Sequence, residues 1–512
     1  TQAVSSYRGD IARHVGVSDS RVEVHAEFVG GGFGAKFGPG AEGVLAARMA
    51  RKYKKPCKVM LTRWEEHVDA GNRPGSIQVL RIAAEASGKI LGGRIHTVGV
   101  TGFRGGGGGM KSPMLYNFGD IYRTKSEITL TSSRPRPFRA PGRPQAAFAL
   151  ESMIDELAQG LGVDPVDMRI INEQSRTRKA QLKDGARRIG WSRRKADGTW
   201  PGRLKHGFGC GGTEWGSWHV NCRARVEVYR TGRVTISSGV QDIGTGTFTV
   251  AADTAAATLG LPRTLIDARV GRSSYPYGPG SGGSQVSRTL APAVMNGCEK
   301  ALRALRRLVA RSWGVRAQEV DYAKGVFRSG GKTASWTQVC KLISDEPLAA
   351  DGKVTQRRLG RGNSDGVQFA EVEVDVETGV VRVVKIVAIQ ACGKAVNRMT
   401  AENQICGGVI QGLSYALFEE RRLDRITGGM VNADLEQYRI PGMGDVPVIE
   451  PVLWSGRGQT GVRALGEPPT IPTAGAIANA VANAIGARVY DLPMTPERVL
   501  AALARAGRTW GG

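Results

Sequence analysis

Hydrophobic positions along the chain follow two periods, one typical of strands and one typical of helices. Hydrophobic residues alternate with polar ones over 22–28, and this period of two predicts a strand. A glycine loop at 30–34 follows, and the good helix formers at 44–50 predict a helix. Residues 57–62 predict a second strand.

The same two periods continue through the rest of the chain. Hydrophobic residues recur with helical spacing from 148 to 161, whereas the polar, basic stretch 173–203 has little periodicity and predicts a linker. Turns at Thr231-Gly232 and Thr378-Gly379 predict two strand pairs, 224–228 with 234–237 and the two halves of 367–391. Further helices are predicted at 248–259, 291–312, 400–420, 473–486 and 495–506, the last with Thr495 as N-cap and proline next.

The mixture of strands and helices predicts an α+β fold with mixed sheets. The 512 residues exceed one ordinary core, and a boundary near 190–205 gives a predicted first domain, 1–195, and second domain, 196–512. The sequence contains no run of about 18 apolar residues, so no membrane span is predicted, and no signal peptide is recognised. The chain starts at Thr1 without Met, which indicates a processed, split or truncated chain and does not distinguish cytoplasm from periplasm.

Cysteines and charge narrow the possible chemistry. The seven cysteines are widely spaced and form no CxxC pair, so the sequence predicts mostly reduced, buried thiols rather than a zinc site or an iron–sulfur cluster built by this chain alone. The net charge of +25 is compatible with nucleic acid or an anionic membrane surface. Because the charges are spread along the chain, docking to acidic partner subunits is the favoured interpretation.

Four glycine-rich segments are candidate ligand sites. The first, 30–36, weakly matches the dinucleotide fingerprint, but the acidic residue expected about 20 residues on is absent, and Phe37 after Lys36 excludes a phosphate loop. A tight turn explains this segment equally well. The others, 241–247, 278–284 and 404–408, precede or lie within predicted helices. Several helix N-termini with small residues hold a large anion well, so together the segments predict an extended, phosphate-bearing cofactor.

The order of the motifs along the chain resembles one family. Segment 29–36 (VGGGFGAK) resembles a GGxFGGK loop, 138–145 (FRAPGRPQ) resembles FRGFG-x-PQ, 240–247 resembles QDIGTGT, and 464–469 (ALGEPP) resembles GVGEPP. These are motifs of the molybdenum hydroxylases, the xanthine dehydrogenase and aldehyde oxidase family. The resemblance covers nearly the whole chain, and the motif forms are most similar to those of bacterial aldehyde oxidoreductases.

The resemblance implies two elongated molybdenum-cofactor-binding domains without the family's N-terminal hammerhead region, which a separate chain supplies if the large subunit is split. It also implies a molybdenum–pterin cofactor, in the cytosine dinucleotide form for a bacterial enzyme, whose metal is held by the pterin dithiolene and not by protein side chains. Electrons would pass to a small iron–sulfur (2Fe-2S) subunit and a medium FAD subunit, because no site for either group is visible in this chain.

The resemblance also assigns roles to individual residues. The family hydroxylates carbon with oxygen from water, and Glu467 is implied as the carboxylate base. Arg139 is implied as the arginine near the molybdenum, where a fixed guanidinium holds oxygen ligands or developing negative charge. Their alternative roles are an exposed loop carboxylate and a structural ion pair. Cofactor contacts, with turn or cap roles as alternatives, are implied for Gly32, Phe33, Gly34, Asp242, Gly244, Thr245, Gly246, Gly283, Ser284, Gln404 and Gly466.

Departures from the family pattern narrow the range of possible substrates. Phe37 stands where xanthine-oxidising members have Glu, glycines at 105–109 stand where they have Arg, and Pro141 replaces the aromatic residue that sandwiches purines. Ala140 replaces the Cys of copper-type carbon monoxide dehydrogenases. Oxidation of an aldehyde to a carboxylic acid is therefore the favoured reaction. Its pocket is predicted to include Phe37, Pro141, Trp215 and Trp218, with core packing as the alternative for both tryptophans.

Three other hypotheses stay open. They are hydroxylation of a nicotinate- or purine-like N-heterocycle, a non-catalytic basic protein with salt-sensitive nucleic-acid affinity, and an NAD-binding dehydrogenase built on 30–35. The intact Glu467 motif argues against the second, and the missing acidic residue argues against the third. The sequence does not fix the exact substrate, the electron acceptor or the subunit stoichiometry.

Overall fold

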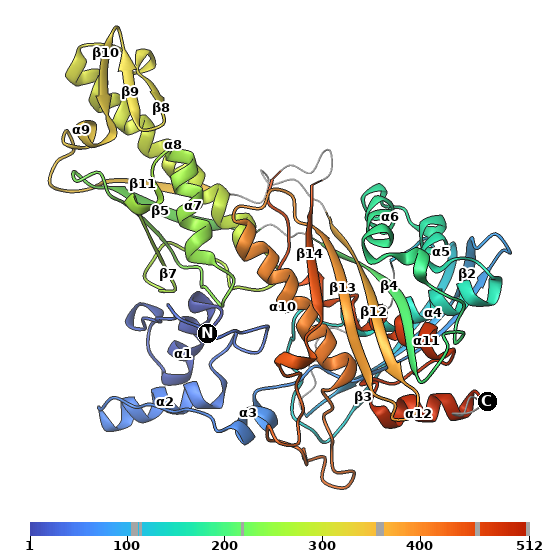
Figure 1. Cartoon of the computed structure of the whole chain (residues 1–512). Coiled ribbons are helices and arrows are strands. Elements are labelled where there is room, and N and C mark those ends of the chain that lie inside the picture. Colours follow the sequence, from blue (N-terminus) through green and yellow to red (C-terminus); the bar gives the residue numbers. More distant parts are fainter. Residues whose placement is uncertain (104–110, 112–114, 217–219, 355–362, 456–460, 508–512) are drawn as a thin grey trace.

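The computed structural model describes all residues except 104–110, 112–114, 217–219, 355–362, 456–460 and 508–512. Figure 1 shows a block of sheets and helices, from which the long helix α8 (Val286–Trp313) leads away to a small lobe. The N-terminal helices lie beside the block. Parallel and antiparallel strands occur in the same sheets, which confirms the predicted α+β class with mixed sheets.

A sheet in the order β14-β13-β12-β4 forms the centre of the block. Its middle strand β12 is buried along most of its length, because helices cover both faces and the strand can therefore be hydrophobic throughout. Val372 packs towards α10 (Arg398–Leu417) and α11 (Thr473–Ile485), and Phe369 packs towards α6 (Arg176–Ile189). The strands are β4 (Leu204–Gly216), β12 (Asn363–Asp375), β13 (Val381–Ala391) and β14 (Val448–Trp454).

Alternate glycines on β4 let α11 pack directly against the strand backbone. A Cβ atom at Gly207 or Gly209 would stand 2.0 or 2.2 Å from backbone atoms of Ala480 in α11. The helix itself is rich in alanine, and all of its residues are buried. This close packing fixes the segment before α11, which carries Glu467.

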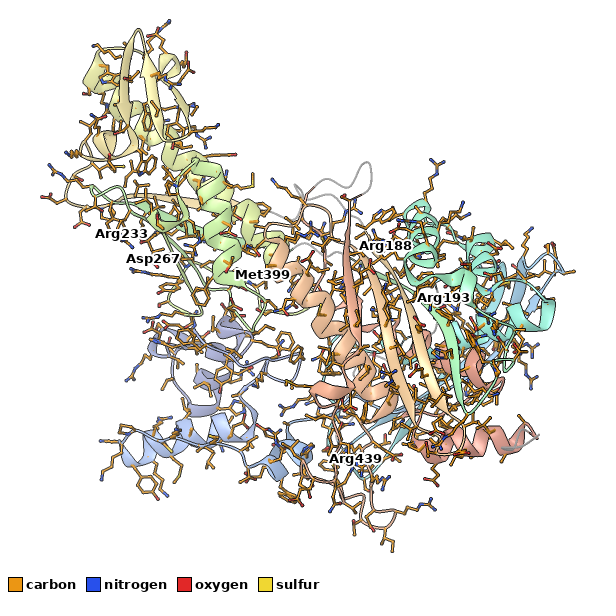
Figure 2. The ribbon with its side chains drawn as sticks, viewed as in Figure 1. Arg188, Arg193, Arg233, Asp267, Met399 and Arg439 are labelled. Carbon is orange, nitrogen blue, oxygen red and sulfur yellow. The ribbon has the colours of Figure 1, made fainter. Side chains whose placement is uncertain are left out.

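Ion pairs fix α6 and the turn that follows it on the sheet, and Figure 2 labels the two arginines that make them, Arg188 and Arg193. Arg188 Nη1 lies 2.6 Å from Glu450 Oε1 of β14, and Arg193 Nη2 lies 2.9 Å from Glu371 Oε2 of β12. The prediction of a linker over 173–203 is wrong because α6 lies within it. Part of the buried face of α6 is polar, so hydrophobic periodicity did not reveal the helix.

The second sheet, in the order β11-β5-β6-β7, packs against α7 (Thr247–Leu259) and α8. The predicted hairpin is confirmed, since β5 and β6 are antiparallel, and β7 continues the sheet parallel to β6. The strands are β5 (Cys222–Val228), β6 (Val234–Ser238), β7 (Ile266–Val270) and β11 (Leu348–Val354). The small lobe contains β8 (Asp321–Ala323), β9 (Val326–Ser329), β10 (Lys332–Ser335) and α9 (Trp336–Cys340).

The N-terminal region contains three helices and a sheet in the order β1-β2-β3, which packs against α4 and α5. Two strands predicted there are wrong. Segment 22–28 makes only an isolated bridge, between His25 and Arg272, and 57–62 has no assigned structure and is mostly exposed. Hydrophobic alternation does not supply a partner strand. The elements are α1 (Val4–Val15), α2 (Gly40–Tyr53), α3 (Arg63–Asp69), β1 (Ser76–Ala84), β2 (Ile90–Thr101), β3 (Asp120–Thr129), α4 (Arg143–Leu161) and α5 (Pro165–Asn172).

The remaining predictions of secondary structure are confirmed. The predicted helices correspond to α2, α4, α7, α8, α10, α11 and α12 (Pro496–Arg505), and the strand pair in 367–391 corresponds to β12 and β13. The Thr495 side chain caps α12 by accepting from Arg498 N. None of the helices in the described part of the chain has the length and apolarity that a membrane crossing needs. The division into domains at 1–195 and 196–512 stays a prediction.

Candidate active site

A cavity of about 870 Å³ brings together segments that are far apart in the sequence. All four glycine-rich segments contribute residues to its wall. A cavity of this size suits a large organic ligand. The wall is formed mainly by residues within 29–37, 137–141, 243–245, 281–287, 392–404 and 462–467.

Three of the cavity loops have the same construction, in which a strand is followed by a loop and then a helix. β6 leads into α7, β7 into α8, and β13 into α10. Thr245, Gln285 and Asn397 lie at or next to the three helix N-termini, and all of them line the cavity. Helix N-termini carry partial positive charge, so this arrangement favours an anionic ligand.

Charged side chains reinforce this preference. Among the described residues that line the cavity, Lys111, Arg139, Lys394 and Arg463 are cationic, and Glu467 alone is acidic. The site is therefore positive overall, although it contains one carboxylate.

Three residues in or next to the cavity wall have left-handed backbones without being glycine. The φ angle is 48° at Phe33, 59° at Ala140 and 56° at Ser284. This conformation is strained for a residue with a Cβ atom, and such strain concentrates at functional sites. Phe33 O accepts from Arg139 N at 2.8 Å, and the other two residues contact Glu467. The strained positions therefore surround the two residues with predicted catalytic roles.

Glu467 lines the cavity at the start of a short turn, Pro468–Thr470. Its Oε1 accepts from Ala140 N at 3.3 Å, and its Oε2 accepts from the Ser284 hydroxyl at 3.3 Å. Its own backbone N donates to Ser284 Oγ at 2.7 Å. Burial raises the pKa of Glu467, while these hydrogen bonds and the charges of Arg139 and Arg73 oppose the rise. A carboxylate with a raised pKa is a stronger base, which suits proton transfer near neutral pH.

Arg139 joins the Glu467 segment to α10 through neutral acceptors. Its Nε donates to Gly466 O at 2.6 Å, its Nη1 to Gln411 Oε1 at 3.1 Å and its Nη2 to Gln404 O at 2.8 Å. Burial lowers the pKa of Arg139 to about 10, so the guanidinium stays charged at neutral pH. The arginine therefore fixes the loop and supplies a positive charge beside Glu467.

Most residues predicted to contact the cofactor line the cavity, and three do not. A Cβ atom on Gly32 would stand 2.5 Å from Gln2 Oε1, so Gly32 packs against that side chain instead. Asp242 Oδ1 accepts from the N–H groups of Gly244, Thr245 and Gly246 at 2.9–3.2 Å and so shapes its own loop. Gly246 packs against Thr400. The residues that do line the cavity are Phe33, Gly34, Gly244, Thr245, Gly283, Ser284, Gln404 and Gly466.

Three of the four residues predicted for the substrate pocket lie in the cavity wall. Phe37, Pro141 and Trp215 line the cavity, and Trp215 Nε1 donates to Gly283 O at 3.2 Å. The Phe37 ring packs under the loop at Gly282, where an added Cβ atom would stand 2.5 Å away from it. Trp218 and the glycines at 105–109 lie outside the described residues.

Several residues of the cavity were not predicted. Gln2 is buried and joins two glycine-rich segments, since its Nε2 donates to Ser281 O at 2.7 Å and its Oε1 accepts from Gly34 N at 3.0 Å. No sequence signal marks this contact. A sequence signal did exist for Lys394 and Asn397. They lie between the strand that ends at 391 and a predicted helix, as the glycine-rich loops also lie before helices. Lys111 and Arg463 also line the cavity.

Comparison with protein families identifies the chain. A family model described as a molybdopterin cofactor-binding domain matches residues 1–173, and a second model with the same description matches residues 184–447. The chain belongs to the molybdenum hydroxylases of the xanthine dehydrogenase and aldehyde oxidase family. As in the relatives of this family, it is the molybdenum-binding part of an oxidoreductase.

Individual relatives agree with this assignment. The chain is 32% identical to the aldehyde oxidoreductase molybdenum-binding subunit PaoC of Escherichia coli K12, over 98% of this chain and 70% of that protein. It is 28% identical to the putative xanthine dehydrogenase molybdenum-binding subunit XdhA of the same strain, over 98% of this chain and 72% of that protein. The fold resembles that of quinoline 2-oxidoreductase from Pseudomonas putida 86, with a TM-score of 0.87, 20% identity and coverage of 98% and 71%.

The residues of the cavity fit a molybdenum–pterin cofactor. The cofactor is anionic through its phosphate, and the cavity combines helix N-termini with Lys394, Arg463 and other cations. Glycine at 244 has a φ of 88° and no atom within 4 Å of an added Cβ, so its backbone is open to a ligand. In the described residues no group of three His, Cys, Asp or Glu side chains is placed to hold a metal ion.

Proposed function

We propose that this chain oxidises an aldehyde to the carboxylic acid, with Glu467 as the base. The position of the Glu467 carboxylate carries the proposal, because it lies in the cavity between the Ala140 N–H, the Ser284 hydroxyl and the Arg139 charge. The aldehyde gains oxygen that comes from water and loses electrons. The cofactor supplies the oxygen-transfer and redox chemistry when it is bound.

Each side chain has a defined task in this proposal. Glu467 takes the proton from the water-derived oxygen before that oxygen attacks the carbonyl carbon. The Ala140 N–H and the Ser284 hydroxyl fix the two carboxylate oxygens so that the carboxylate keeps one orientation. Arg139 holds the Gly466 carbonyl and stabilises negative charge that develops on oxygen. Glu467 must be ionised to act, so turnover falls as pH falls through its raised pKa.

An aldehyde is preferred over an N-heterocycle as the substrate. Phe37, Pro141 and Trp215 give the cavity an apolar side with no carboxylate besides Glu467 in the described lining. A site that recognises a purine needs polar partners for its ring nitrogens and oxygens. The relative with 32% identity is an aldehyde oxidoreductase, whereas XdhA, with 28% identity, keeps the N-heterocycle as the second candidate class.

We also propose the cytosine dinucleotide form of the cofactor, and electron transfer to a small iron–sulfur subunit and a medium FAD subunit. The row of helix N-termini in the cavity extends from α7 to α10 and supports a cofactor with more than one phosphate. The net charge of +25 supports docking to acidic partners. The proposed cofactor-binding domains are 1–195 and 196–512.

The test is Glu467→Gln in the complex purified with its partners. Glutamine keeps the size of the side chain and removes its basicity, so kcat should fall by about 10²–10⁴-fold on an aromatic aldehyde. Molybdenum, iron and released CMP should be unchanged in the variant, because the cofactor contacts remain. The wild type should turn over aromatic aldehydes faster than nicotinate or xanthine.

Each part of the proposal has its own contrary result. Near-normal turnover of Glu467→Gln refutes the base assignment. Faster turnover of nicotinate or xanthine by the wild type would mean that the substrate is an N-heterocycle and not an aldehyde. Molybdenum without CMP refutes the dinucleotide form.

A further inference from the structure

Arg73 is a partly buried cation next to the site, and the proposed mechanism does not yet use it. We propose that Arg73 is a positioning residue for Glu467, whose guanidinium joins the two segments that hold the Glu467 carboxylate and places a positive charge near it. This inference rests on the proposed role of Glu467 as the base. Arg73 does not line the cavity, so it acts through its neighbours.

The first segment that Arg73 holds is the loop before α4. Arg73 Nη2 donates to Arg139 O at 2.8 Å. The next residue is Ala140, whose N–H donates to Glu467 Oε1. The Arg73 guanidinium also lies over the Phe138 ring, 4.7 Å from its centre, and this stacking favours a planar cation. The strained loop at Ala140 is therefore held from behind by one side chain.

Three further hydrogen bonds fix Arg73 and its two chain neighbours. Its Nη1 donates to Gln145 Oε1 at 3.3 Å, and Gln145 Nε2 donates back to Pro74 O at 3.1 Å. Arg136 N donates to Asn72 O at 3.1 Å. The backbone on both sides of Arg73 is thus bonded to the segment that the guanidinium supports.

The second segment is the turn that begins with Glu467. The Arg73 guanidinium lies 5.7 Å from the centre of the Tyr415 ring. The Tyr415 hydroxyl donates to Thr470 O, and Thr470 N donates to Glu467 O at 3.3 Å. Arg73 therefore contacts, through Phe138 and Tyr415, the elements on both sides of the carboxylate.

The charge of Arg73 is not neutralised by a close ion pair. In the described part of the chain no carboxylate oxygen lies within 4.0 Å of its nitrogens, and its Nε is buried without a hydrogen-bond partner. Burial lowers the pKa of Arg73 to about 10, and Tyr415, Glu419 and Glu467 act on it in the opposite direction. The charged groups that lower the pKa of Glu467 are Arg139 and Arg73.

The experiment measures kcat/KM against pH for Arg73→Met and Arg73→Lys in the loaded complex. Methionine removes the charge and the donors, so the pKa of Glu467 should rise, the acidic limb should move to higher pH, and kcat/KM at a fixed pH on that limb should fall several-fold. Lysine keeps the charge but lacks the planar fork that serves Arg139 O and Gln145 together. Its acidic limb should stay in place while kcat falls.

Arg421→Met is the matched control. Arg421 is also partly buried, its Nε is also without a partner, and in the described part of the chain it has no carboxylate within 4.0 Å. Its Nη2 donates to Ser133 Oγ at 2.8 Å, and it is not among the charges that lower the pKa of Glu467. This variant should leave the acidic limb where it is.

The outcomes separate the two proposals. An acidic limb of Arg73→Met that coincides with the wild type, or moves equally in Arg421→Met, overturns the role of Arg73. If Arg73→Met does not accumulate as a loaded complex, Arg73→Lys decides, and an unchanged kcat overturns the role. Failure of the base assignment is seen separately, as near-normal turnover of Glu467→Gln.

Discussion

Arg169 and Arg139 are both buried, yet they have different kinds of partners. Arg169 Nε lies 2.8 Å from Glu151 Oε2, and its Nη1 lies 3.0 Å from Asp155 Oδ1, so the guanidinium is neutralised by carboxylates. Arg139 is held by two carbonyls and one amide oxygen. The nearby carboxylate, Glu467, accepts instead from Ala140 and Ser284. The charge of Arg169 therefore stabilises the fold, whereas the charge of Arg139 is not paired with a carboxylate and acts on the cavity.

The two arginines show how one chain separates the groups that stabilise the fold from those that act at the cavity. The Arg169 group joins α4, α5 and β4, because the guanidinium also donates to Pro165 O and Cys210 O. Burial lowers the pKa of Arg169, but the charges of the neighbouring groups, Cys210 first and then Glu151 and Asp155, outweigh burial and raise the pKa, so the charge is permanent. At the cavity, burial without a paired carboxylate lowers the pKa of Arg139 instead. Neutral acceptors fix an arginine in place without neutralising its charge.

The largest effect is expected when Arg169 is replaced. Arg169→Met leaves Glu151 as a buried charge without its cation, which should lower the free energy of unfolding by about 3–5 kcal/mol. Urea denaturation of the variant and the wild type measures this loss. The double variant Arg169→Met/Glu151→Gln also removes the buried charge of Glu151 and should recover part of the lost stability. A single variant as stable as the wild type would show that the group does not hold the fold.

A smaller loss of stability and a larger loss of activity are expected for Arg139→Met. The acceptors it leaves are neutral, so the free energy of unfolding should fall by only about 1–3 kcal/mol. Turnover near neutral pH should fall by about 10²-fold, because the charge beside the reacting oxygen is lost. Arg139 lowers the pKa of Glu467. Its removal therefore raises that pKa, and the acidic limb of kcat/KM should move to higher pH.

The outcome for Arg139 is read from two measurements together. Urea denaturation gives the free energy of unfolding, and steady-state kinetics from acidic to alkaline pH give the position of the acidic limb of kcat/KM. Unaltered kinetics with lowered stability would place Arg139 with Arg169 as a structural residue. The comparison between the two arginines would then fail.

The sequence predicted the long elements of the fold because their patterns are strong and local. β12 and β13 flank the predicted turn at Thr378-Gly379, and α12 begins at the predicted cap Thr495. The missed helix α6 faces inward partly with Arg178 and Gln181, whose burial depends on partners such as Asp365. Those partners are far away in the sequence, so no local pattern reveals them.

The candidate site was predicted unevenly for the same reason. Glu467, Arg139 and the glycine-rich loops lie in recognisable motifs, and the structure brings them to one cavity. Gln2 and Arg73 lie in no such motif. Gln2 is 279 residues away from Ser281, the residue it holds, so its role exists only in the folded chain. Asp242 lies in a motif, but its carboxylate bonds the loop's own N–H groups, which the letters alone do not show.

The smallest effect is expected for an arginine that is paired but exposed. Arg316 Nη2 lies 2.6 Å from Glu319 Oε1, and the arginine side chain is 81% exposed. Water and salt screen this pair, so Arg316→Ala should change the free energy of unfolding by less than about 1 kcal/mol, and salt should reduce the difference further. Urea denaturation at low and high salt measures it. A loss as large as that of Arg169→Met would mean that carboxylate pairing, and not burial, makes Arg169 important for the fold.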